Sequence, residues 1–75
     1  MTSTPSLNAR QLIRVLGKLG FIHTRSRGSH RRFEHPDGRK TTVPVHKGRT
    51  IPRGLLYQIV TIDLGITMDE FAAHL

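Results

Sequence analysis

The spacing of apolar residues predicts an amphipathic helix near the start of the chain. Asn8 and Gln11 have the spacing of a helix-capping box, and Gly20 is a typical residue to follow the end of a helix. Apolar residues recur at helical intervals between these signals: Ala9, Leu12, Ile13, Leu16 and Leu19. The pattern predicts one buried helix face, preceded by a flexible tail over residues 1–7.

Shorter runs rich in β-branched and aromatic residues follow, and turn-forming residues separate them. This pattern predicts three strands over residues 21–25, 30–35 and 40–45, with turns at residues 26–29 and 36–38. Side chains alternate between the two faces of a strand. If Phe33 is buried, His30 and Arg32 therefore lie on the opposite, exposed face.

Two further helices are predicted in the last third of the chain. Pro52 suits the first turn of one helix, and Gly65 marks its end. Its expected buried stripe is Leu55, Leu56, Ile59 and Ile62. Thr67 and Glu70 have the spacing of a second capping box, which begins a short final helix. The apolar positions of that helix are Met68, Phe71, Ala72 and Leu75.

The order of these elements predicts an α+β fold. We expect an α-β-β-β-α domain over residues 8–66, with a three-stranded antiparallel sheet and its helices on one face. Residues 67–75 form a short C-terminal helical extension. With 75 residues in total, the chain has material for only one core.

Positive charge is concentrated in one part of the chain. All 12 lysines and arginines lie between Arg10 and Arg53, a segment whose only acids are Glu34 and Asp37. The segment from Gly54 onward contains three acids and neither lysine nor arginine. Such a concentrated positive field favours a polyanionic partner, above all nucleic acid.

Composition narrows the remaining classes of function. There are no cysteines, so disulfides, thiolate nucleophiles and cysteine-type zinc sites are excluded. The histidines lack a recognised metal-ligand spacing, so we expect no metal and no other cofactor. The first residues lack the blocks of a secretory signal, and no apolar run has the length of a membrane span. We therefore expect a soluble, cytoplasmic protein.

Gly28-Ser29-His30 is the strongest candidate for a catalytic element. A histidine exchanges a proton near neutral pH, and here arginines follow it directly. RNA supplies its own nucleophile: a general base can remove the ribose 2′-OH proton, and the oxygen then attacks the adjacent phosphorus. His30 is the candidate base, with Ser29, Arg32 and His46 as auxiliary candidates. The candidate RNA-binding residues are Arg10, Arg14, Arg25, Arg27, Gly28, Arg31, Lys47, Arg49 and Arg53.

Several motifs together carry a family resemblance. They are Leu12-Ile13-Arg14-Val15-Leu16, Leu19-Gly20-Phe21, Gly28-Ser29-His30-Arg31-Arg32-Phe33, His35-Pro36-Asp37-Gly38, Val43-Pro44-Val45-His46 and Pro52-Arg53-Gly54-Leu55-Leu56. With them the chain resembles the HicA family of toxin mRNA interferases, from bacterial and archaeal toxin–antitoxin pairs. The resemblance implies a fold like that of double-stranded-RNA-binding domains and ribonuclease activity centred on His30. It also implies a HicB-type antitoxin that binds the toxin and blocks its active surface.

The residues themselves leave two other functions open. The first is a non-catalytic RNA-binding module of the same fold, which would bind RNA through phosphates and 2′-hydroxyls without cutting it. The second is an interaction protein whose basic surface serves only an acidic protein partner. The role of His46 also stays open.

Overall fold

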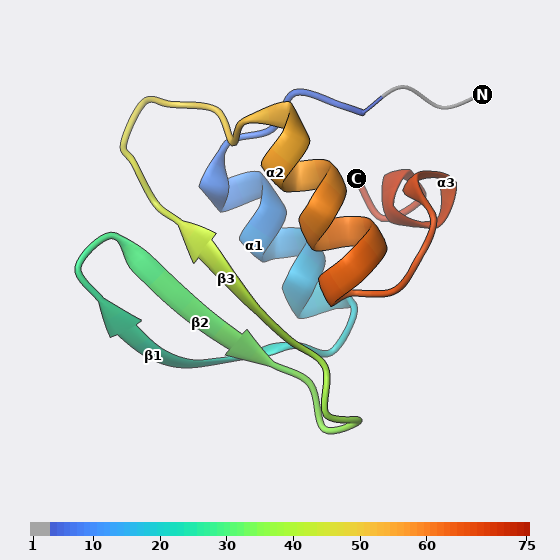
Figure 1. The fold of residues 1–75 in the computed structure, drawn as a ribbon, viewed down its shortest axis with the longest axis horizontal. Helices are drawn as coiled ribbons and strands as arrows, with labels where there is room; N and C mark the ends of the chain where they lie inside the picture. The colour runs from blue at the N-terminus through green and yellow to red at the C-terminus, as the bar shows by residue number, and fades with distance from the viewer. Residues whose placement is uncertain (1–3) are drawn as a thin grey trace.

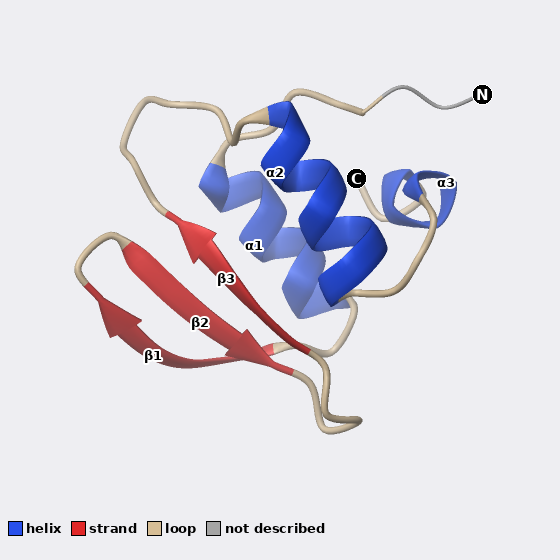
Figure 2. Cartoon of the chain, viewed as in Figure 1, coloured by secondary structure: helices blue, strands red, loops and turns tan. Residues whose placement is uncertain are grey.

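A three-stranded antiparallel sheet with helices on one face forms the fold in the computed structural model, which describes residues 4–75 (Figure 1, Figure 2). In chain order the elements are α1 (Ala9–Lys18), β1 (Ile22–Arg27), β2 (His30–Glu34), β3 (Lys40–Pro44), α2 (Arg53–Gln58), the π-helical turn η1 (Ile59–Asp63) and α3 (Met68–Ala72). The predicted α+β order with a C-terminal helix is confirmed. Within the described residues, the helices are all too short to cross a membrane.

Both predicted capping boxes are present. Oδ1 of Asn8 accepts a hydrogen bond from the backbone N–H of Gln11, and Oε1 of Gln11 accepts one from the N–H of Asn8, each at 2.9 Å. Thr67 and Glu70 exchange the equivalent bonds at 3.1 and 3.2 Å. These contacts satisfy backbone donors that a helix start otherwise leaves unpaired, and so they fix where α1 and α3 begin.

The prediction for the second helix was wrong at Ile62, whose side chain is 68% exposed. The cause is η1, in which the N–H of Leu64 donates to the carbonyl of Ile59 at 2.9 Å. This i→i+5 bond adds a residue to the turn. Ile62 is therefore rotated toward solvent, while Leu64 and Val60 are fully buried.

The strand register separates the two faces of the sheet as predicted. Arg31 pairs with Val43 and Phe33 with Thr41. Phe33, Thr41 and Val43 are buried beneath the helices. His30, which pairs with Pro44, belongs to the alternate face and is exposed. The helices thus cover one face of the sheet, and we call the uncovered side the open face.

The core extends beyond both predicted boundaries of the main domain. Leu7, assigned above to the flexible tail, is only 4% exposed, and its carbonyl accepts a hydrogen bond from the N–H of Ile51. The tail prediction therefore does not hold at Leu7, and residues 1–3 lie outside the described part of the chain. At the other end, Phe71 of α3 is fully buried. The C-terminal extension therefore shares the core of the sheet and the longer helices.

The β2–β3 hairpin tip is fastened to the helical layer by Arg39. Its Nε donates to Oδ2 of Asp37 at 2.8 Å, and its Nη1 donates to the carbonyl of Leu64 at 2.6 Å. The guanidinium also lies 5.2 Å from the centre of the Phe21 ring. His35 packs edge-on against the same ring. One arginine therefore joins the hairpin, the start of the sheet and the end of η1.

Candidate functional site

The open face carries His30 among three arginines. Arg27 lies opposite His30 across the β1–β2 ladder, and Arg25 lies opposite Arg32. Residues directly opposite in an antiparallel pair share a face and lie close together. These four side chains, with Ser26 and Thr42, line a shallow concavity of about 280 Å³ that has no carboxylate in its lining. The arrangement combines a proton acceptor with concentrated positive charge, which suits a phosphodiester.

A β-bulge places Arg25 and Arg27 on the open face. The register of β1 is irregular between His23 and Arg25. His23 lies opposite Phe33 on the covered side, with the two ring centres 5.3 Å apart. Strict alternation would put Arg25 on that covered side too. The extra residue, Thr24, shifts the alternation and returns Arg25 and Arg27 to the face of His30.

Arg32 is held loosely by its neighbours on the open face. Its Nε lies 3.8 Å from Oε2 of Glu34, which accepts a hydrogen bond from the hydroxyl of Thr24 at 3.1 Å. This Nε is buried and has no hydrogen-bond partner within residues 4–75. A long, partly exposed ion pair of this kind contributes at most about 1 kcal/mol. The contact with Glu34 therefore contributes little to the stability of the folded protein.

The turn before His30 is tighter than predicted. Gly28 has a φ of 60°, while Ser29 has no positive φ. This combination is typical of a two-residue type II′ hairpin turn, whose first central position favours glycine. The predicted four-residue turn therefore shortens, and β1 continues to Arg27. Ser29 accepts a hydrogen bond from the N–H of Val45 at 2.7 Å, which ties this turn to the segment after β3.

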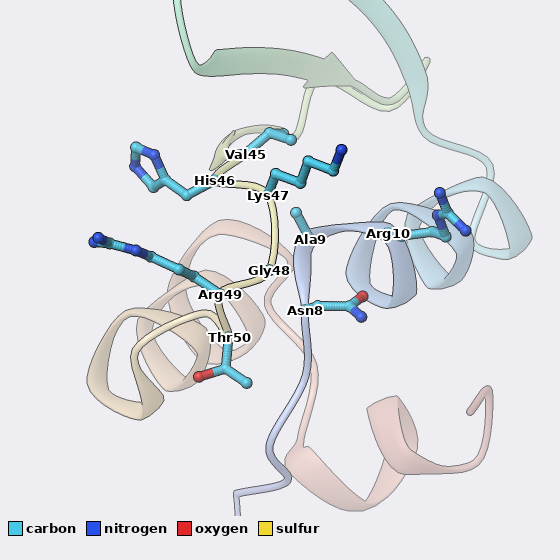
Figure 3. A pocket seen from close by; sticks show the side chains of 9 residues that line it. All are labelled: Asn8, Ala9, Arg10, Val45, His46, Lys47, Gly48, Arg49 and Thr50. Atoms are coloured by element: carbon cyan, nitrogen blue, oxygen red, sulfur yellow. The ribbon is translucent and has the colours of Figure 1, made fainter.

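A second concavity, of about 390 Å³, lies between the loop that follows β3 and the start of α1 (Figure 3). It is lined by Asn8, Ala9, Arg10, Val45, His46, Lys47, Gly48, Arg49 and Thr50. In Figure 3, Lys47 and Arg10 extend to the same side, whereas His46 and Arg49 extend to the other side of the loop. We call this feature the loop cavity.

The structure brings together only part of the predicted RNA-binding set. Arg31 pairs with Val43 and so belongs to the covered side of the sheet, although it is exposed. Arg14 lies on α1 beside the segment preceding that helix and the C-terminal residues, apart from the open face. Arg53 is the first residue of α2 and is exposed.

Sequence reasoning missed Thr24, Glu34 and Thr42 as parts of the site. The position of Thr42 on the open face follows from the strand register, because Thr42 pairs with Arg32. The position of Thr24 depends on the bulge, which has no clear signal in the sequence. Within residues 4–75 there is no group of three or more histidine, aspartate or glutamate side chains placed to hold a metal ion.

Comparison with protein families identifies a family for most of the chain. A family model described as the HicA toxin of bacterial toxin–antitoxin systems matches residues 9–66. The matched segment runs from the first residue of α1 to the residue before the capping box of α3, and it includes the whole sheet. The family resemblance noted in the sequence is thereby confirmed. No curated protein matches the chain.

Proposed function

Because the chain belongs to the HicA family of toxins from toxin–antitoxin systems, we propose that it is an endoribonuclease with His30 as its general base. The observation that carries this proposal is the position of His30, exposed on the open face between arginines of two strands. Arg27 lies directly opposite it, and Arg25 and Arg32 form the next pair. A positioned base beside fixed cationic donors is the minimum equipment that RNA cleavage requires.

In the proposed reaction, the imidazole of His30 takes the proton from a ribose 2′-OH. The 2′-oxygen then attacks the adjacent phosphorus, the bond from phosphorus to the 5′-oxygen breaks, and that oxygen takes up a proton. The products are a 2′,3′-cyclic phosphate and a 5′-OH end. Arg25, Arg27 and Arg32 donate to the non-bridging oxygens, where negative charge increases in the transition state.

The substrate in this proposal is messenger RNA in a single-stranded form, and the controlling partner is a HicB-type antitoxin. The antitoxin would neutralise the toxin by covering the open face. This proposal can be tested by chemical modification of His30 with diethyl pyrocarbonate in the free toxin and in the complex. Protection of His30 in the complex supports it, and equal modification in both states contradicts it.

The test of the nuclease proposal compares wild-type protein with His30→Ala on long RNA in EDTA. Loss of a positioned general base should lower the cleavage rate by about 10²–10⁴-fold. His74→Ala is the matched control, because the backbone carbonyl of His74 accepts the hydrogen bond from Lys18, and the substitution keeps that carbonyl. Circular dichroism should show that both variants are folded. End-group analysis should find cyclic phosphates and 5′-OH ends.

Two results would overturn this proposal. If the wild type binds a varied RNA pool but cuts none of it, in EDTA or with added magnesium, the non-catalytic RNA-binding module is the better description. If His30→Ala cleaves as fast as His74→Ala, the base lies elsewhere.

A further inference from the structure

We propose that the loop cavity is a second RNA-binding subsite, which takes a phosphodiester and its nucleoside at some distance from the linkage cleaved at His30. This inference rests on the proposed function for the identity of the strand. The loop cavity shares no lining residue with the concavity on the open face, so the two are separate sites.

The lining of the loop cavity suits a nucleotide rather than an inorganic ion alone. Ala9 and Val45 are the apolar side chains of its lining, and they offer contact to a ribose or base. Arg10 and Lys47 border this apolar surface and extend to the same side of it (Figure 3). Recognition of nucleotides commonly combines such apolar contact with cationic groups for the phosphate.

The charge of the loop cavity is uncompensated. No carboxylate lines it, and within residues 4–75 neither Arg10 nor Lys47 forms an ion pair. Arg39 and Lys18 differ from these two residues, because Arg39 pairs with Asp37 and Lys18 donates to the carbonyl of His74. Two unpaired cations beside one concavity repel each other, and a phosphate between them would relieve that repulsion.

Both walls of the cavity are held in place before any ligand binds. The capping box fixes Asn8 at the start of α1, and Asn8 also forms an isolated antiparallel bridge with Thr50. The neighbouring N–H of Ile51 donates to the carbonyl of Leu7 at 2.6 Å. A preformed site loses less entropy on binding than one that the ligand must order.

The cavity is also connected to the catalytic element. Pro44 pairs with His30, and the next residue, Val45, donates to the carbonyl of Ser29. Lys47 follows Pro44 by three residues, so its Cα lies at most about 11 Å from the Cα of Pro44. A single RNA strand of a few nucleotides can therefore contact His30 and the loop cavity together.

The experiment measures the binding of single-stranded RNA to full-length His30→Ala protein over a range of salt concentrations. Each phosphate contact of a single strand contributes about 0.7 to the slope of log K against log [salt]. Adding Arg10→Gln and Lys47→Gln should therefore lower the magnitude of the slope by about 1.4. Lys18→Gln is the control, because it removes a positive charge from the same helix as Arg10 but outside the loop cavity. In this variant Arg10 and Lys47 should still contribute about 1.4 to the slope.

An unchanged slope in the Arg10→Gln, Lys47→Gln protein would overturn the subsite. An equal decrease for Lys18→Gln would also overturn it, because it would show a general field effect. Cleavage assays separate this inference from the proposed function. With His30 restored, the two substitutions should raise KM for long RNA more than KM for an RNA dinucleotide, which is too short to reach from His30 to the loop cavity. If the wild type cuts no RNA at all, the nuclease proposal fails, whereas a decreased slope still supports the subsite.

Discussion

The two faces of the sheet differ in burial and in charge, although the same strands form both. The covered face holds Phe33, Thr41 and Val43, each at most 4% exposed. The open face holds His30 and Arg32, taken from the same strand as Phe33. Because side chains alternate, β2 supplies the core with one set of residues and the candidate site with the other. Stability and chemistry can therefore be separated by substitution within a single strand.

The largest effect is expected on the covered face. Phe33→Ala removes a buried aromatic side chain, which typically costs about 3–5 kcal/mol. Domains have a total stability of only about 5–15 kcal/mol, so this loss is a large fraction of the free energy of unfolding. Urea unfolding followed by circular dichroism measures the change. A loss below about 1 kcal/mol would show that the covered face does not carry the core.

The opposite result is expected on the open face. Arg25→Gln together with Arg27→Gln should leave the free energy of unfolding within about 0.5 kcal/mol of the wild type, because both side chains are exposed. The salt slope of RNA binding should fall by about 1.4, since two phosphate contacts are lost. Urea unfolding and RNA titration of the same preparation check both statements. A clear loss of stability with unchanged RNA binding would show that these arginines stabilise the fold and do not bind RNA.

A smaller, pH-dependent effect is expected where the hairpin meets the helical layer. The backbone N–H of Arg39 donates to the carboxylate of Asp37, and this bond lowers the pKa of Asp37 from its ordinary value of 3.8. Desolvation opposes the shift, while the guanidinium of Arg39 and the ring of His35 assist it. A lowered pKa means that the ionised carboxylate stabilises the folded state above pH 3.8, and that this contribution disappears as the pH falls through the folded-state value.

Asp37→Asn tests this contribution. The wild type should be more stable than the variant near pH 5, and the difference should shrink as the pH is lowered toward 2. Unfolding free energies of both proteins at each pH provide the measurement. A difference that grows toward low pH would contradict the assigned direction of the pKa shift.

The smallest effect is expected on the outer side of the helical layer. Ile62→Gln should change the free energy of unfolding by no more than about 0.5 kcal/mol, because this side chain is 68% exposed. Val60→Ala, two residues away and fully buried, should be clearly more destabilising. Equal losses for the two variants would mean that the π-helical turn does not place Ile62 toward solvent.

Signals that act over a few residues were enough to predict most of the fold. The capping residues Asn8 and Thr67 and the Pro36-Asp37-Gly38 turn mark element boundaries through local hydrogen bonding, which the sequence carries directly. Given a buried Phe33, the exposure of His30 follows from strand alternation. These are local rules, and they hold wherever an element keeps its regular period.

Prediction from the sequence was wrong or incomplete where an element changes its period. The π-helical turn moved Ile62 outward, and the bulge at Thr24 moved Arg25 onto the open face. Both irregularities insert one residue and so shift the face of the positions that follow. The candidate site was therefore predictable at His30 and Arg32, which lie in a regular strand, but the faces of the β1 arginines were not.

The most direct test of the central claim uses RNA with one 2′-deoxynucleotide at a site that the wild type cuts. If His30 activates the ribose 2′-OH, cleavage at that linkage should cease while cleavage at unmodified linkages and RNA affinity stay the same. Continued cleavage at the deoxynucleotide would show that water or another nucleophile attacks the phosphorus, and it would contradict the assignment of His30.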